Sequence, residues 1–570
     1  MAYVAPANID GAYDPRSHLT EVEEDDAVAP HTDLFPDGTP INLETYMYWA
    51  KIRREEEKAD TTAGPANPWL RFFSMKKSAP THETASESPS DEKKEKGSDT
   101  GSAVISAGEY RHASGALRTA SWGSVFYLIT TDILGPYSAP FAFQQVGYGP
   151  GVATFIGFGL MAAYSGACLW WMFMKVDSTK YPARTFGDLG YRLLGSGFRH
   201  LCNILQSLQL IFNVGIIILG NGQGLSQMAK FQLCFSVCNL VWMLAGMILG
   251  QVRTLAKFGW LASLSIWMNV LVLIMTMASV AHSLPNYIGS GLDAAPVITQ
   301  AINRQPFEPQ LNGIMQIVFS YGGAMIFTEF MSEMRKPMDF WKAMACAQVF
   351  ITFVYMFFGI FVYAYQGQFT MNPANQGISA YGLQTATNAI SLTAGLIAAA
   401  LYGNIGIKIF YQNIFVNLLK FPQHSSPKGK WIFAVAVLVY WSLAFVIGSA
   451  IPQFSNISSL IAAACIFQFT YTFPAIMILA YSMQVDAIEG DREYDPANPH
   501  GSRVDTWRQA SRWKRALKKN ILFKAFNFLV FFACLAAVGL AMYSSITAIK
   551  AGFATDGSAT SFGCKSPVDN

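Results

Sequence analysis

The stretch Thr119–Phe143, TASWGSVFYLITTDILGPYSAPFAF, decides the fold. It supplies the roughly 20 mostly apolar residues that a helix needs to span a bilayer. Its middle cannot stay helical, because Pro136 and Pro140 each remove a backbone donor and Gly135 tolerates unusual dihedrals. Non-helical backbone at membrane depth persists only where it is buried in protein or lines a cavity. We therefore interpret the stretch as a broken helix around a site; a kinked structural span is the alternative.

The composition indicates one polytopic membrane domain with a soluble extension. Hydrophobic residues make up 52% of the chain, and the charges gather in the N-terminal tail and in short loops. The formal net charge of +3 gives no reason to expect a nucleic-acid partner. Among the eight cysteines only Cys564 lies outside an apolar run, so the pattern is not that of a disulfide framework.

Residues 1–117 are predicted to form a disordered cytoplasmic tail, because they are too polar to bury a core. No signal peptide opens the chain, so the first span is expected to act as its own insertion signal. Within the tail, Asn42–Lys58 reads as a short helix, either docked on the cytoplasmic face or transient; the sequence favours a transient helix. Lysines interleaved with serines between residues 76 and 96 suit regulation by modification, so regulatory partners of the tail are expected, although a solvated tail would look the same.

Hydropathy predicts about eleven membrane spans. They lie near residues 119–143, 150–174, 201–224, 231–250, 256–281, 312–334, 343–366, 385–410, 431–451, 456–483 and 521–548. With a cytoplasmic N-terminus, Lys and Arg gather in every inside loop, most densely at residues 503–519, and the outside loops carry little besides Lys230 and Arg304. The chain therefore divides into the tail, a transmembrane transporter domain at 118–550 and a short extracytoplasmic tail at 551–570.

A second broken span is predicted in the sixth segment, NGIMQIVFSYGGAMIFTEFMSEMRKP, which has Tyr321, Gly322 and Gly323 at its centre. The second break lies five spans after the first. Because five is odd, a five-span repeat enters the membrane from the opposite side the second time. Inverted repeats with discontinuous first helices are a transporter arrangement in which substrate binds near the midplane. The alternative is that the glycines only allow close helix packing.

Apart from residues near the span ends, the spans contain three ionisable residues, Asp132, Glu329 and Lys408. Each costs about 2.5 to 3.5 kcal/mol at mid-bilayer even on the gentler scale, so a function is the first hypothesis. Asp132 is predicted to bind a proton or orient the substrate amine, or else to be a buried hydrogen-bonded acid. Glu329 is predicted to serve proton coupling or gating, or to pair with a basic loop residue. Lys408 is expected to snorkel to the interface.

Freed amides at a break can bind a carboxylate and freed carbonyls can bind an ammonium, which together suit a zwitterion. Besides Asp132, the candidate substrate contacts are Gly135, Tyr137 and Ser138 at the first break, Phe319, Ser320, Tyr321 and Gly322 at the second, and Asn213 and Thr393 in the third and eighth spans. The last two are weaker candidates, because a polar side chain there can simply link helices.

The runs ILGPYSAPFAFQQVGYGPG and FSYGGAMIFTEFMSEMRKPMDFWKA, together with the eleven-span layout, resemble the amino acid/auxin permease family of the amino acid/polyamine/organocation superfamily, and most of all its fungal neutral amino-acid permeases. The resemblance covers roughly residues 110–550. It implies an all-α 5+5 inverted repeat with broken helices 1 and 6 plus one extra helix, in which spans 1, 2, 6 and 7 rock against spans 3, 4, 8 and 9. It also implies proton-coupled import of aliphatic and aromatic amino acids, and the plasma rather than the vacuolar membrane. The chain departs from animal relatives in having Pro136 and Tyr137 where their first break is richer in glycine.

The expected function is therefore alternating-access symport of a neutral amino acid, with the lipid bilayer as surroundings and no cofactor beyond the proton. No enzyme activity is expected, because the spans lack a cluster of nucleophile, base or metal ligands. A non-transporting amino-acid receptor and a vacuolar exporter or antiporter remain the alternatives. Asn456 begins an Asn-Ile-Ser glycosylation pattern, but it lies so near the membrane that we expect it to stay unmodified.

Overall fold

The structure is a computed structural model that describes residues 35, 38–59, 118, 120–133, 135–251, 259–411, 415–416, 419–422, 427–496, 498–499, 501, 503–554 and 560–569. At 131–133, 259–263 and 427 it describes the backbone alone. The chain splits into two compact units, one of residues 1–41 and 63–119 and the other of residues 42–62 and 120–570. Within the first unit the described part is a short turn, in which the Phe35 and Thr39 backbones are hydrogen-bonded. The larger unit holds all of the described helices.

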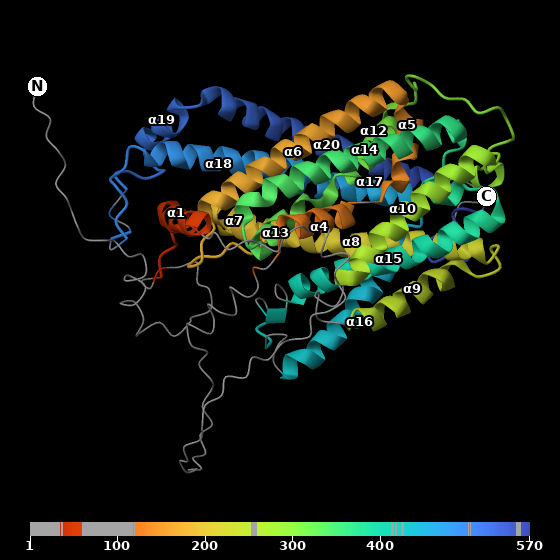
Figure 1. Cartoon of the computed structure of the whole chain (residues 1–570), viewed down its shortest axis with the longest axis horizontal. Coiled ribbons are helices and arrows are strands. Elements are labelled where there is room, and N and C mark those ends of the chain that lie inside the picture. Colours follow the sequence, from red (N-terminus) through yellow and green to blue (C-terminus); the bar gives the residue numbers. More distant parts are fainter. Residues whose placement is uncertain are drawn as a thin grey trace, which may run out of the picture. The chain divides into compact units, whose positions relative to one another are not determined.

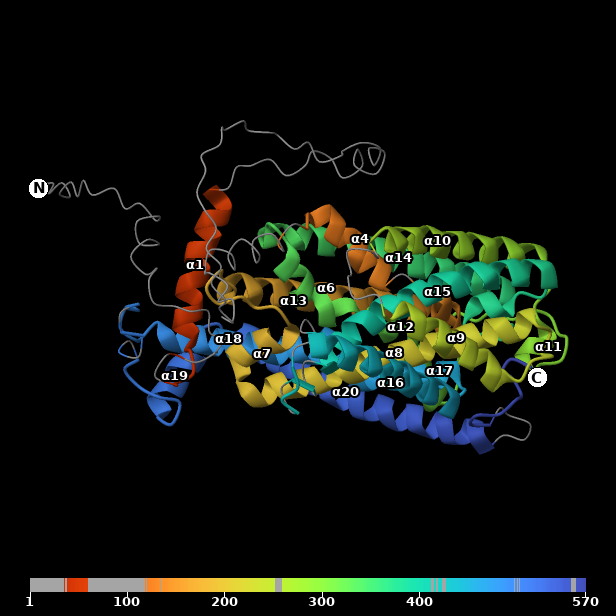
Figure 2. The same ribbon diagram turned by 90° about the horizontal axis from the view of Figure 1, so that it is seen from below.

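The larger unit is a bundle of long apolar helices that lie side by side, with α1 (Leu43–Ala59) and α19 (Ala510–Lys518) near one end and the C-terminal end of the chain at the other (Figures 1 and 2). Its elements at the eleven predicted spans are α4 (Trp122–Ile133) with η2 (Pro136–Ser138) and α5 (Ala139–Val146), α6 (Tyr148–Val176), α8 (Ser196–Met228), α9 (Phe235–Leu249), α10 (Gly259–His282), α12 (Phe307–Phe319) with η4 (Gly322–Ile326) and α13 (Phe327–Glu333), α14 (Phe340–Gln366), α15 (Tyr381–Phe410), α16 (Pro427–Ala450), α17 (Phe454–Ile461) running through the π-helical turns η9 (Ala462–Ile466) and η10 (Gln468–Thr472) into α18 (Phe473–Ile488), and α20 (Ile521–Ala554).

Eight of these segments are long and apolar enough to cross a membrane as they stand, and the bent pair at residues 307–333 makes a ninth. The two remaining predicted spans are the broken first one and α9, which is a shorter apolar helix. In the described part of the chain β-pairing is limited to isolated bridges, such as that between Ala120 and Met334. The protein is therefore an all-α polytopic membrane protein.

The first span is interrupted where the sequence predicts it. After α4 the chain becomes extended at Gly135 (φ −156°, ψ 65°), then forms the short 3-10 turn η2, which begins at Pro136. Pro140 does not add a second break. It lies in the first turn of α5, where a proline costs no helical hydrogen bond. The interruption thus covers about one turn, and the next helix starts immediately after it.

The sixth span is interrupted at the predicted Tyr-Gly-Gly sequence. α12 ends at Phe319, η4 forms a 3-10 turn from Gly322, and α13 completes the span. The two halves are bent by 40°. Both broken helices therefore have their irregular turn near the middle of the span, as the inverted-repeat hypothesis requires.

Helix pairs in the first half of the bundle have equivalent pairs in the second half. The first span packs against the seventh, α14, as the sixth packs against the second, α6. The fifth span, α10, packs against the eighth, α15, as the tenth, beginning with α17, packs against the third, α8. A two-fold axis that relates spans 1–5 to spans 6–10 produces these equivalent contacts, because it replaces span 1 by span 6, span 2 by span 7, span 3 by span 8 and span 5 by span 10.

A dense apolar core joins α8, α9, α15 and α16, the third, fourth, eighth and ninth spans. Trp441 is fully buried in this core. A Cβ at Gly246 would lie 2.1 to 2.4 Å from atoms of the Trp441 ring, so only glycine allows α9 to approach α16 this closely. These four spans form one tightly packed block, to which the resemblance gives the role of scaffold.

The segment favoured as a transient helix is instead a packed element, which corrects that prediction. α1 contacts α6, and its buried face carries Leu43, Tyr46 and Ala50 at helical spacing. The Arg192 guanidinium lies over the Tyr46 ring, 4.4 Å from its centroid. Arg54 near the other end of α1 forms an ion pair of 3.3 Å with a buried aspartate that follows α6.

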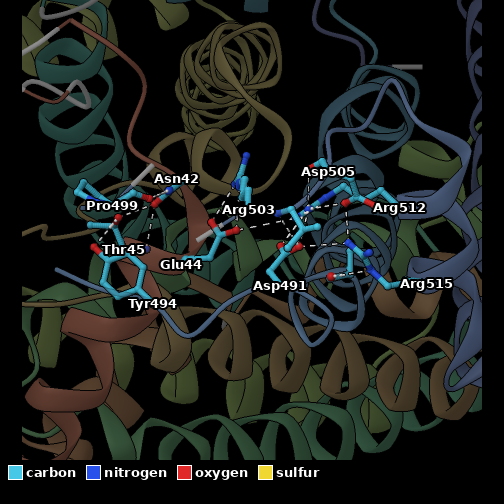
Figure 3. A network of polar contacts seen from close by, with 12 residues as sticks. Asn42, Glu44, Thr45, Asp491, Tyr494, Pro499, Arg503, Asp505, Arg512 and Arg515 are labelled. Atoms are coloured by element: carbon cyan, nitrogen blue, oxygen red, sulfur yellow. Dashed lines mark hydrogen bonds and ion pairs between the residues drawn. The ribbon is translucent and has the colours of Figure 1, made fainter. Parts of the chain in front are cut away.

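Ionic contacts from the loop between α18 and α19 complete the docking of α1 (Figure 3). Glu44 accepts hydrogen bonds from Nε and Nη2 of Arg503, both at 2.8 Å, and this contact raises the pKa of the arginine. Thr45 accepts a 2.9 Å bond from Tyr494. These partners lie about 450 residues from α1, so the sequence near α1 could not reveal them. Most other residues of the predicted tail lie outside the described ones.

A disulfide joins Cys234 to Cys564, a single pair that the cysteine pattern, interpreted as no disulfide framework, did not predict. The predicted fourth span placed Cys234 inside the membrane, whereas α9 begins one residue after it. The cysteine therefore sits at a helix end, where the C-terminal segment reaches it. Backbone bonds from Phe235 to Cys564 and from Phe562 to Ser449 hold that segment across the ends of α9 and α16.

Candidate functional site

A cavity of about 210 Å³ lies between the two broken helices. It is smaller than the roughly 300 to 1,000 Å³ clefts that hold drug-sized ligands, which suits a single small metabolite. Both breaks, the spans α8, α10, α14, α15 and α17, and the loop before α15 contribute side chains. The polar lining residues are Tyr137, Ser138, Gln209, Asn213, Asn221, Asn269, Tyr355, Asn375, Gln376, Ser391 and Tyr402, and the larger apolar ones are Ile216, Ile217, Phe319, Met325, Phe454 and Ile466.

Hydrogen bonds of two tyrosines stabilise the non-helical backbone at the first break. The amide of Gly135, freed by the extended backbone, donates to the Tyr355 hydroxyl of α14 at 3.1 Å. Tyr137 donates to Asn269 Oδ1 of α10 at 2.8 Å. Pro136, which begins η2, has no N–H, so the N–H groups at the start of η2 are those of Tyr137 and Ser138. They have no acceptor within the helix, and they mark the positive end of the half-helix that follows. This end of the cavity is suited to a carboxylate.

Amides of α8 line the opposite wall. Gln209, Asn213 and Asn221 recur at four and eight residues, so they lie along one face of the helix. The Gln209 amide donates to the Gly322 carbonyl at the second break, at 3.5 Å. Gln209 Oε1 and Asn213 Oδ1 are buried and accept no hydrogen bond from any described residue. Buried oxygens without a donor are costly, so a ligand with N–H groups would satisfy them.

The loop between α14 and α15 closes a further side of the cavity with two more amides. Asn375 and Gln376 belong to the buried turn η7 (Ala374–Gly377). Gln376 donates to the Gly220 carbonyl of α8 at 3.2 Å, while its Oε1 is a third buried oxygen without a donor among the described residues. Asn375 donates to Asn388 of α15 at 3.1 Å. The turn is thus fixed to both neighbouring helices.

The cavity has a polar lining without formal charge. None of the described residues that line it is acidic or basic. An amide-lined wall can bind an ammonium and a carboxylate through hydrogen bonds, but it offers no counter-ion for a charged side chain. Such a site accommodates a small zwitterion.

Comparison with known families agrees with this geometry. The model of the family "Transmembrane amino acid transporter protein" matches residues 118–486, which include both breaks and all of the residues that line the cavity. The chain belongs to this family.

Fungal relatives of the transporter share its long middle section. The chain is 25% identical over 366 residues to the "N amino acid transport system protein" of Neurospora crassa, covering 62% of this chain and 74% of the relative. It is 22% identical over 374 residues to a "Transmembrane transporter" of Fusarium pseudograminearum, covering 63% of this chain and 75% of the relative. Family membership points to membrane transport of amino acids and not to an enzyme.

The transporter brings six of the predicted contacts to the cavity: Gly135, Tyr137, Ser138, Asn213, Phe319 and Gly322. Three others lie elsewhere. Ser320 donates to the Gln316 carbonyl of its own helix, and Tyr321 donates to the Phe155 carbonyl of α6 at 2.9 Å. Thr393 is on the exposed face of α15 and bonds to the turn before it. Near a helical break successive residues point in different directions, so only part of each predicted run can face one cavity.

Of the two acids that the sequence analysis singles out in the broken helices, Glu329 is not among the described residues that line the cavity. Asp132 is in the last turn of α4, three residues before Gly135, and its side chain lies outside the described residues. Glu329 of α13 accepts a 2.9 Å hydrogen bond from Gln206 Nε2 of α8, which also donates to the Met325 carbonyl. The partner of Glu329 is thus an amide of a neighbouring span, and not a basic loop residue as one hypothesis held.

Several lining residues were not among the sequence predictions. Polar residues recur at helical spacing along the otherwise apolar α8, and this pattern could have identified Gln209 and Asn221 as lining residues. A lone amide in the apolar run of α10 could likewise have marked Asn269. No local signal marks Asn375 and Gln376, because their loop reaches the site only through tertiary packing.

Proposed function

We propose that this transporter imports neutral amino acids, aliphatic and aromatic, by proton symport with alternating access. The observation that carries the proposal is the cavity between the breaks, which combines buried amide oxygens without donors and no charged lining residue in the described part. The ammonium would bind Asn213 and Gln376, the carboxylate would bind the N–H groups that open η2, and Phe319 and Ile216 would contact an apolar side chain. The name of the Neurospora relative, which includes amino-acid transport, supports the same substrate class.

Contacts across the second break support the alternating-access step. Gln206 and Gln209 extend from α8, which belongs to the packed block, to the Met325 and Gly322 carbonyls of the sixth span. A rocking motion of the sixth span against that block would have to exchange these bonds. Weak, replaceable hydrogen bonds of this kind allow two arrangements of similar free energy.

Proton coupling is proposed for Asp132 and Glu329, because these two acids lie on the two broken helices. Gln206 bonds Glu329 directly, so protonation of the carboxyl would change a contact between the sixth span and the packed block. One charge crossing 100 mV yields about 2.3 kcal/mol, enough for roughly fiftyfold accumulation.

The proposed topology places the N-terminus in the cytoplasm and the Cys234–Cys564 disulfide on the opposite side. Disulfides persist in oxidising compartments, which include the outside of the cell. The most basic described loop, at residues 503–519, lies at the same end of the bundle as α1 (Figure 1), which agrees with the positive-inside rule. We propose the plasma membrane as the location, on the resemblance to fungal permeases.

Two transport assays distinguish a residue that binds substrate from one that couples transport to the proton. In proteoliposomes, Asp132→Asn and Glu329→Gln are each assayed for exchange of labelled leucine against internal leucine and for uptake driven by an inward proton gradient without sodium. A coupling residue keeps exchange and loses gradient-driven uptake. If both variants keep gradient-driven uptake, neither acid couples the proton; if arginine or glutamate replaces leucine as the preferred substrate, the proposed pocket chemistry fails.

A further inference from the structure

The loop that joins the tenth span to the last one contains the short amphipathic helix α19, which the proposed transport function does not use. Its buried side carries Arg512 and Ala516. The opposite side exposes two adjoining sectors, an apolar one with Trp513 and Leu517 and a basic one with Lys514 and Lys518. Each sector is made of residues four apart, so each forms a continuous stripe along the helix.

Buried ion pairs hold this helix in a fixed orientation (Figure 3). Arg512, with its side chain 2% exposed, lies 2.9 Å from Asp491 and 3.2 Å from Asp505. Arg515 pairs with the same two aspartates. The hydrogen bond from Ser511, with those from Arg515 and Arg512, holds the pKa of the Asp505 carboxyl below its usual range. Since these contacts lie on one side of α19, the helix cannot turn its exposed stripes inward without breaking them.

A second set of contacts joins α19 to the membrane span α20. Lys524, buried in the first turn of α20, forms an ion pair with Asp486 of α18 and donates to the backbone carbonyls of Ala516 and Lys519. The first residues of α20, Ile521 and Leu522, are 62% and 87% exposed, as expected for side chains that face lipid. Leu517, at the end of the apolar stripe of α19, is therefore followed four residues later in the chain by the exposed apolar side chains that open a membrane span.

The basic stripe is available to a ligand. Neither Lys514 nor Lys518 has an ion pair or hydrogen bond within the described part of the chain. Lysines beside an apolar stripe, immediately next to a membrane span, are placed to meet anionic headgroups while the apolar side chains reach the acyl boundary.

We propose that α19 lies in the bilayer interface and binds anionic phospholipid headgroups through Lys514 and Lys518, with Trp513 and Leu517 inserted beside them. Two observations carry the inference: the positive charge of the basic stripe, and the position of α19 immediately before the exposed apolar start of the membrane span α20. Each lysine near an anionic surface contributes roughly fivefold to the affinity, so the pair should contribute about 25-fold.

Native mass spectrometry of the full chain in detergent, with added phosphatidylserine or phosphatidylcholine, tests this directly. The wild type should retain phosphatidylserine in preference to phosphatidylcholine, and salt should reduce the preference. In the double variant Lys514→Gln, Lys518→Gln the affinity for phosphatidylserine should fall about 25-fold. The double variant Lys514→Arg, Lys518→Arg keeps both charges and should keep the preference. The matched control Lys51→Gln, Lys58→Gln removes the same charge from two exposed lysines of α1, also predicted on this side, and should behave like the wild type.

Three results would overturn the proposal. The first is a wild type without preference for phosphatidylserine, and the second is a glutamine variant at 514 and 518 that keeps it. The third is full displacement of phosphatidylserine by inorganic phosphate, which would mean a soluble-anion site with no role for the apolar stripe. None of these measurements depends on transport, so they stay decisive whatever substrate the cavity binds.

Discussion

Replacing Glu44 by glutamine should loosen α1 from the body of the transporter. The carboxylate is 3% exposed and accepts two charge-assisted bonds from Arg503, at 2.8 Å each, with Arg512 at 3.9 Å. Glutamine keeps the shape of the side chain but removes its charge. The change therefore tests the ionic contact and leaves the packing of α1 in place.

The magnitude follows from how buried each partner is. Removing one member of a fully buried ion pair costs about 3 to 5 kcal/mol. Here the Arg503 side chain is 35% exposed, so water screens part of the interaction and can solvate the arginine after the change. Arg512 keeps its bonds to two aspartates. We expect a loss of about 1 to 2 kcal/mol in the docking of α1.

Hydrogen exchange followed by mass spectrometry measures this local free energy. If exchange of the α1 amides reports the docking equilibrium, a loss of 1 to 2 kcal/mol makes it roughly 5 to 30 times faster. Glu56→Gln on the same helix is the matched control. Glu56 is 48% exposed and pairs with Arg53 on the surface, so its removal should change exchange less than about threefold.

Two outcomes would refute the reasoning. Equal protection of α1 in Glu44→Gln and the wild type would show that the ionic contact does not hold the helix. Equal loss of protection in the two variants would show that any charge change on α1 acts alike, whatever its partner.

Three further changes test the packing, the topology and the site. Gly246→Ala forces a methyl group against the Trp441 ring and should cost about 1 to 3 kcal/mol, seen as a lower Tm in detergent, whereas Gly157→Ala, where a Cβ meets nothing within 4 Å, should not lower it. Cys234→Ser should free its disulfide partner for labelling by a membrane-impermeant maleimide on intact cells, while the wild type needs an impermeant reductant first; labelling only after permeabilisation would reverse the proposed topology. Asn213→Leu removes an oxygen proposed to accept from the substrate ammonium and should raise KM roughly 5- to 100-fold; an unchanged KM would place the ammonium elsewhere.

The sequence predicts those features of the fold that depend on local chemistry. A proline within a helix removes a hydrogen bond and a glycine before it relaxes the backbone, and the structure breaks at Gly135 and Pro136. The Tyr-Gly-Gly sequence of the sixth span is also the place of a break, although glycines alone do not require one. The odd spacing of the two breaks then predicts the reciprocal packing of the halves.

The sequence does not show which side of each break faces the cavity. Phe319 and Gly322 line it, while Ser320 and Tyr321 between them point away, because the turn of the chain from α12 into η4 sets the directions. Long-range partners are equally hidden. Glu44 pairs with Arg503 across 459 positions of sequence, and only the folded chain brings the two together.

The central claim is that the cavity between the two breaks carries a neutral amino acid across the membrane with a proton. Accumulation of labelled leucine by wild-type proteoliposomes under an inward proton gradient, without sodium, tests it most directly. We predict concentrative uptake, up to roughly fiftyfold at 100 mV for one proton, that a protonophore abolishes. Leucine that binds the protein but never accumulates inside the vesicles would contradict the account and favour a receptor.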